Sequence, residues 1–154
     1  MAKNYTGLLR PVPLTISGTI SMAASLPAGS LTYVSVTPDP TQPTVSSNGF
    51  SAPSSETWVV TGVETYSAPS PDGVVRFKIN TVDQNVTFGP LSQTLPTIYH
   101  RKSLQNFLEL EPNAQAQPYF VNTAANGTAA ATIDVQIYIT RLPRGYKGPF
   151  AVYS

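Results

Sequence analysis

The sequence predicts an all-β domain, an antiparallel β-sandwich or barrel of about eight strands in which a jelly roll is the expected arrangement. Two observations support this fold class. Apolar and polar residues alternate with a period of two in several segments, while helical periodicity is almost absent. Prolines and turn dipeptides such as Asp72-Gly73 and Asn126-Gly127 separate these segments, as expected of connections between strands.

The clearest alternation lies near the two ends of the domain. In residues 14–22 the apolar side chains fall on even positions, with Gly18 as an expected bulge or bend. In residues 132–140 they fall on odd positions without a break. Each segment is expected to be a long strand with one buried face. Further strands are expected at residues 31–37, 56–66, 74–80, 84–88, 104–110 and 118–122.

Two segments do not follow the alternation. A short helical turn is expected near residues 97–106. Residues 38–55 are rich in proline and serine, so we expect a long irregular connection that lies on another surface. Trp58, the only tryptophan, is in phase with Val60, and this favours burial in the core over exposure as a sugar-stacking platform.

The expected organisation is a β-sandwich at residues 14–140, with an N-terminal extension at residues 1–13 and a C-terminal extension at residues 141–154. The C-terminal extension carries aromatic side chains that need a surface to cover. We expect inter-subunit contacts in these extensions and in the irregular connection. The candidate residues are Arg10, Phe50, Arg141, Arg144, Tyr146, Phe150 and Tyr153.

The charge content is unusually low. Only 11% of the residues are charged, compared with about 25% in ordinary soluble domains. A neutral surface avoids the cost of desolvating ions when another chain covers it. This composition therefore favours a protein that packs against neighbours, although an extracellular β-domain shares the same bias.

Acidic and basic residues are unevenly distributed along the chain. All acidic residues lie between Arg10 and Arg141, while bases are found near both ends. Basic ends on a faintly acidic body are expected to tie the termini to a neighbouring subunit. The bases are too sparse for a nucleic-acid-binding arm, so direct genome binding is not expected.

Cysteine is absent, which excludes disulfides and thiolate metal sites. No apolar run approaches the roughly 20 residues needed to cross a bilayer. The first residues have no continuous apolar stretch behind Lys3, so a signal peptide is not expected.

Catalysis is not expected. His100 is the only histidine, and a serine-type triad would have to combine it with Ser92 or Ser103 and with Asp83 or Asp134. No nucleophile elbow accompanies these residues, so His100 is interpreted as a surface or interface residue. Glu109 and Glu111 share one face of an expected strand, and the alternation explains them as its polar face. No metal or other cofactor is expected.

The whole chain resembles small virion proteins, namely single-jelly-roll capsid subunits and the β-rich decoration proteins of tailed phages. The features are the lack of cysteine, the low charge, the Ser/Thr/Pro-rich loops, and the closing strand at residues 132–140 followed by Arg141-Leu142-Pro143-Arg144. The resemblance implies self-assembly, contacts with other capsid proteins, and a place in a virion assembled in the host cytoplasm. The alternative is a carbohydrate- or receptor-binding module of a viral fibre or an extracellular protein.

Overall fold

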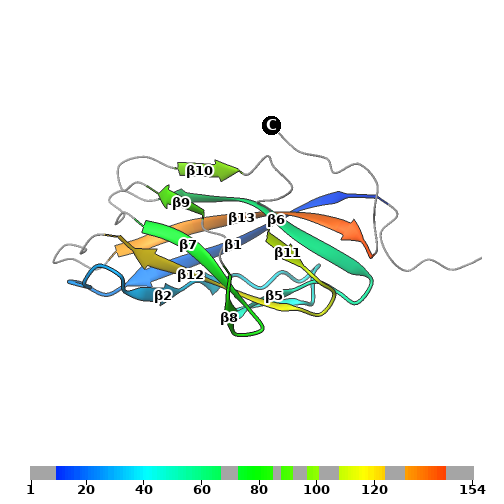
Figure 1. Ribbon diagram of the computed structural model, residues 1–154, viewed down its shortest axis with the longest axis horizontal. Helices are drawn as coiled ribbons and strands as arrows, with labels where there is room; N and C mark the ends of the chain where they lie inside the picture. The colour runs from blue at the N-terminus through cyan, green and yellow to red at the C-terminus, as the bar shows by residue number, and fades with distance from the viewer. Residues whose placement is uncertain are drawn as a thin grey trace, which may run out of the picture.

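The computed structural model describes residues 10–66, 73–84, 88–91, 97–100, 108–123 and 131–144, and every regular element in these ranges is a strand (Figure 1). The strands are β1 (Val12–Met22), β2 (Leu31–Tyr33), β3 (Ser35–Val36), β4 (Val45–Ser46), β5 (Gly49–Ser51), β6 (Glu56–Tyr66), β7 (Gly73–Ile79), β8 (Val82–Asp83), β9 (Phe88–Leu91), β10 (Thr97–His100), β11 (Leu108–Leu110), β12 (Gln115–Asn122) and β13 (Ala131–Pro143). Within these ranges there is no helix long and apolar enough to cross a membrane.

The strands form two antiparallel sheets. The first sheet has the order β10-β6-β13-β1-β3, with β11 also paired to β6. The second sheet has the order β4-β5-β12-β7-β8, with β2 also paired to β12 and β9 to β7. Figure 1 shows the long strands β1, β6 and β13 of the first sheet running together across the molecule.

The pairing between strands is nested along the chain. The first strand β1 pairs with the last strand β13, β2 and β5 pair with β12, β6 pairs with β10 and β11, and β7 pairs with β9. A hairpin rolled up so that its successive pairs alternate between two sheets is a jelly roll. The fold expected from the sequence is therefore confirmed.

The long terminal strands have the expected buried face. The register of β1 against β13 runs without a break from Val12 opposite Arg141 to Met22 opposite Ala131. Ile16, Ile20 and Ile137 lie on the inner face and are buried. Burial of each such side chain contributes about 1.5–3 kcal/mol, so this pair of strands is a main source of stability.

An aromatic cluster fills the space between the sheets. Trp58 is 0% exposed and lies 6.3 Å from Phe50, measured between ring centroids. Phe77 lies 6.3 Å from Phe50 and 5.7 Å from Phe88, with both pairs of rings edge to face. Trp58 is thus a core residue, as its phase with Val60 predicted.

A bulge at Thr61 changes the phase of β6. Trp58 and Val60 face the core before it, and Val63 faces the core after it. The register of β13 passes from Gly62 opposite Tyr138 to Val60 opposite Ile139 and so skips Thr61. The extra residue rotates the rest of the strand, which is the usual effect of a β-bulge.

Gly18 does not form the expected bulge, because the β1–β13 register is continuous through it. Instead, Gly18 allows the segment around β3 to pass close to β1. A Cβ atom at this position would lie 2.7 Å from the Val34 side chain and 2.9 Å from the Ser35 carbonyl oxygen. Only glycine leaves room for the segment around β3 to cross at this point.

Two further expectations are wrong. The turn expected at residues 97–106 is a strand over 97–100, because this backbone pairs with Thr65 to Gly62 of β6; residues 101–106 lie outside the described ranges. Residues 38–55 are not structureless, since they contain β4 and β5 and bury Val45, Phe50 and Ala52 in the domain's own core. The connection therefore covers its own sandwich.

The remaining strand expectations are met with small shifts. β1 begins at Val12 and β13 extends to Pro143, so both strands reach into the expected extensions. Of the strands expected at residues 84–88 and 104–110, the strand residues within the described ranges are Phe88 in β9 and residues 108–110 in β11; residues 85–87 and 104–107 lie outside the described ranges. The described ranges exclude residues 1–9 and 145–154, so the expected extensions stay predictions.

Candidate interface on the outer face of the second sheet

The outer face of the second sheet carries an aromatic and basic cluster. On β12, the buried residues Pro118 and Phe120 face the core, so Tyr119 faces the outer side of the sheet, where its neighbours cover it and leave it 2% exposed. Its neighbours across the sheet are Tyr33 of β2 and Arg76 of β7. We use the name tyrosine patch for this surface, which consists of Leu31, Tyr33, Arg76, Lys78, Asp83 and Tyr119.

Lys78 stands over both tyrosine rings. Its Nζ atom lies 5.3 Å from the Tyr33 ring centroid and 5.7 Å from that of Tyr119. The two rings meet edge to face, with centroids 6.2 Å apart. Nζ also donates a hydrogen bond of 2.8 Å to the Tyr33 hydroxyl, and this bond raises the pKa of Lys78. The ammonium is therefore charged at neutral pH and is held by cation–π attraction.

Hydrogen bonds fix the other side of the patch. The Tyr119 hydroxyl donates to Asp83 Oδ1 at 2.5 Å, and Arg76 Nη2 donates to the Gln84 carbonyl at 3.0 Å. Burial and the bond to Asp83 raise the pKa of Tyr119 to about 12. Tyr119 is thus a neutral donor, and the cluster is organised before any partner binds.

The patch also exposes apolar surface. Leu31 and Tyr33 are each 42% exposed. Val121 and Val74 continue the row that begins at Leu31 across the sheet. Tyrosine and arginine beside exposed apolar residues are typical of the centres of protein interfaces.

The outer face of the first sheet has a different character. Strands β1 and β13 present hydroxyl and amide side chains there, and Ser17 Oγ donates to Gln136 Oε1 at 3.0 Å. Its charged groups are Asp134 and Glu109, which are exposed, and Glu64, which is buried and accepts a hydrogen bond from Tyr138. The described strand residues of this face include no lysine or arginine.

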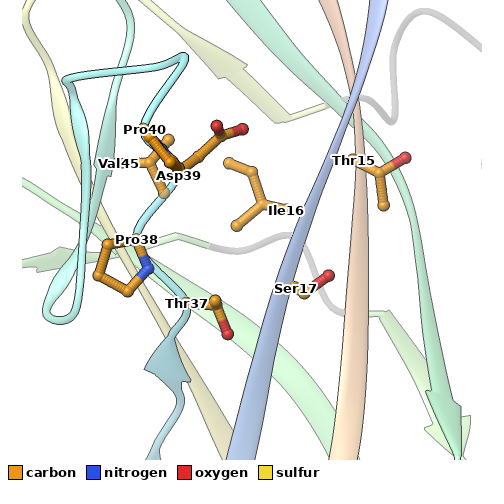
Figure 2. A pocket seen from close by; sticks show the side chains of 8 residues that line it. All are labelled: Thr15, Ile16, Ser17, Thr37, Pro38, Asp39, Pro40 and Val45. Carbon is orange, nitrogen blue, oxygen red and sulfur yellow. The ribbon is translucent and has the colours of Figure 1, made fainter.

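A small groove lies beside β1, between this strand and residues 37–45 (Figure 2). Its volume is about 170 Å³, below the roughly 300 Å³ of the smallest usual ligand sites. The Thr37 amide donates to the Ser17 carbonyl at 2.8 Å, and Pro13, further along the same edge, has no N–H to offer. The groove is lined by Thr15, Ile16, Ser17, Thr37, Pro38, Asp39, Pro40 and Val45.

Two solved structures are similar to this chain. One is a chain of the cyanophage Pam1 capsid asymmetric unit, with a TM-score of 0.49 and 11% identity over 93% of this chain and 93% of that chain. The other is from the giant freshwater prawn Macrobrachium rosenbergii extra small virus (XSV) VLP, with a TM-score of 0.32 and 13% identity over 92% of this chain and 88% of that chain.

No family model and no curated protein matches the chain. Because both identities and both TM-scores are low, we infer function from the residues of this chain alone.

The candidate contact residues are not brought together. Phe50 is 0% exposed in the domain's own core, so its side chain has no surface to offer a second chain. Arg10 and Arg144 are exposed, and the Arg144 amide donates to the Ser55 carbonyl at 3.0 Å. Tyr146, Phe150 and Tyr153 lie outside the described residues.

Arg141 is engaged within its own chain. Its Nε and Nη2 atoms donate to the two carboxylate oxygens of Glu56 at 2.8 and 3.1 Å. Trp58 Nε1 donates to Glu56 Oε1 at 3.0 Å. Burial alone would raise the pKa of Glu56, but the bonds from Arg141 and Trp58 and the guanidinium charge together lower it. The ion pair closes one end of the sandwich.

The residues considered for catalysis do not form a site within the described ranges. Asp83 is bonded to Tyr119 on the second sheet, while Asp134 lies exposed on the first. His100 belongs to β10, where its backbone is opposite Gly62, and Ser92 and Ser103 lie outside the described residues. Glu109 and Glu111 are exposed beside buried Leu108 and Leu110, as the alternation predicted. The described part of the chain contains no group of residues that could hold a metal ion.

The tyrosine patch was not predicted from the sequence. The alternation around Phe77 does indicate that Arg76 and Lys78 point outward. Tyr33 and Tyr119, however, join them only through the pairing of β2, β12 and β7, which brings together residues far apart in the chain. Pairing between strands that are distant in the sequence leaves no recognisable pattern in any one segment.

Proposed function

We propose that this protein is a structural subunit of a virion that assembles in, or decorates and stabilises, a viral or phage capsid. Its partners would be further copies of itself and other capsid proteins. It would act in the virion, after assembly in the host cytoplasm, without catalysis and without binding the genome directly.

The observation that carries the proposal is the tyrosine patch, which lies on a jelly roll of low overall charge. Leu31 and Tyr33 are exposed beside a cluster that the hydrogen bonds of Lys78 and Asp83 already hold in place. An ordered aromatic surface loses little conformational entropy when a partner covers it. The low overall charge extends this property to the rest of the surface, because few ions have to be desolvated.

The proposal is tested by the assembly state of the purified protein. We expect light scattering and electron microscopy to show oligomers, rings or shells whose amount increases with protein concentration. Tyr33→Ala should reduce this assembly while the circular dichroism spectrum stays unchanged. A wild-type protein that remains a monomer at all accessible concentrations, alone and with capsids, would contradict the proposed function.

A second candidate function is binding of a glycan or receptor by the same patch. The observation in its favour is that the Tyr33 ring is 42% exposed beside a charged amine, an arrangement that can stack on a sugar. Glycan-array binding that disappears in Tyr33→Ala would support it. Silence on the array together with concentration-dependent assembly would favour the structural role.

A further inference from the structure

We infer that the tyrosine patch of one copy packs against the outer face of the first sheet of a second copy. This inference rests on the proposed function and names the two surfaces that meet. The two surfaces are the outer faces of the two layers of the sandwich. Each copy would therefore use both of them.

The charges on the two faces have opposite sign. The patch carries Arg76 and Lys78 against Asp83 alone. The described strand residues of the other face carry the acids Asp134, Glu109 and Glu64 and no lysine or arginine. Opposite potentials attract and set the orientation of the partners.

The available hydrogen-bonding groups also match. A lysine ammonium has three donors, and one of those of Lys78 is used by the Tyr33 hydroxyl. The others can reach a carboxylate such as the exposed Asp134. The remaining surface of the acidic face is rich in threonine and serine, which cost little to desolvate beside Leu31 and Tyr33.

Like surfaces would not pair well. A patch packed against a second patch would bring Lys78 of one copy close to Lys78 of the other, and like charges across an interface are unfavourable. A contact between two different faces is heterologous. A pair of copies joined in this way still has one unoccupied tyrosine patch and one unoccupied outer face of the first sheet. Repetition then gives a closed ring or a continuous lattice, which is the geometry that a shell requires.

Charge reversal tests this pairing. We expect Lys78→Glu alone and Asp134→Lys alone each to raise the concentration needed for assembly by at least about tenfold, because each places like charges in contact. An equimolar mixture of the two variants should assemble again, since every contact between unlike variants joins opposite charges. Asp39→Lys, which makes the same charge change in the connection between β3 and β4, away from both faces, serves as the control and should assemble as the wild type does.

The possible outcomes separate the inference from the proposed function. If both single variants assemble normally, or if the mixture stays dissociated, the patch meets another partner or surface and the inference is wrong. In that case concentration-dependent assembly of the wild type still supports the proposed function. Circular dichroism and thermal unfolding of each variant establish that the loss of assembly does not come from misfolding.

Discussion

Two nitrogen atoms of Arg141 donate hydrogen bonds to the carboxylate of Glu56 and so join the last strand to the beginning of β6. The side chains of Arg141 and Glu56 are only 18% and 7% exposed. Truncating one partner of such a pair leaves a charge buried without compensation. The pair therefore matters more for stability than a surface ion pair.

Arg141→Ala is expected to lower the free energy of unfolding by about 3 kcal/mol, because Glu56 then stays buried without its guanidinium partner. Urea unfolding followed by tryptophan fluorescence measures this loss. Arg144→Ala removes an exposed guanidinium and should change the stability by less than about 0.5 kcal/mol. Equal losses in the two variants would mean that the buried pair has no special role.

The same pair predicts a dependence of stability on pH. The pKa of Glu56 is lower in the folded protein than the ordinary glutamate value of 4.5, so the carboxylate contributes stability that is fully present above that value. This contribution is lost as the pH falls through the folded pKa. The difference in unfolding free energy between the wild type and Glu56→Gln should therefore shrink as the pH is lowered from neutrality to below 4.5. A constant difference over this range would show that the pKa is not lowered.

Gly18→Ala is expected to destabilise the fold by about 1–3 kcal/mol, since the added methyl group overlaps the Val34 side chain and the Ser35 carbonyl oxygen. Thermal unfolding measures the loss. Adding Val34→Ala should restore only part of the stability, because the backbone oxygen does not move away. The matched control is Ser21→Ala at an exposed position of the same strand, which should have little effect.

Tyr33→Ala and Tyr33→Phe separate the ring from the hydroxyl. The phenylalanine variant keeps the ring beside Lys78 and Tyr119 but cannot accept the hydrogen bond from Lys78. If the ring anchors a partner, Tyr33→Ala should weaken assembly by at least about tenfold while Tyr33→Phe retains most of it. Both variants should unfold within about 1 kcal/mol of the wild type, because the site is partly exposed.

Local sequence patterns predicted the strands that have one buried face and one polar face. Alternation located β1, β6, β7 and β13 and identified Trp58 as a core residue. It failed at β10, β4 and β5, where short strands are held by pairing with a neighbour and carry little periodicity of their own. Gly18 was singled out for the wrong reason, because the close approach of Val34 depends on tertiary structure.

The candidate site was predicted less well than the fold. Contact residues were predicted in the terminal extensions and in the irregular connection at residues 38–55. However, Phe50 of that connection and Arg141 serve the interior of their own domain. The tyrosine patch needs three strands in register, and the alternation of β7 indicates only Arg76 and Lys78 as outward-facing residues. The periodicity of a segment does not reveal which distant strand it pairs with.

The bulge at Thr61 also has a consequence for how this fold tolerates variation. β10 pairs with β6 up to Gly62, and β11 resumes the pairing at Val60, so the edge strand is interrupted opposite the same residue that β13 skips. The two halves of the edge are each anchored by β6 alone. A substitution that disrupts β10 would therefore leave the register of β11 on β6 unchanged.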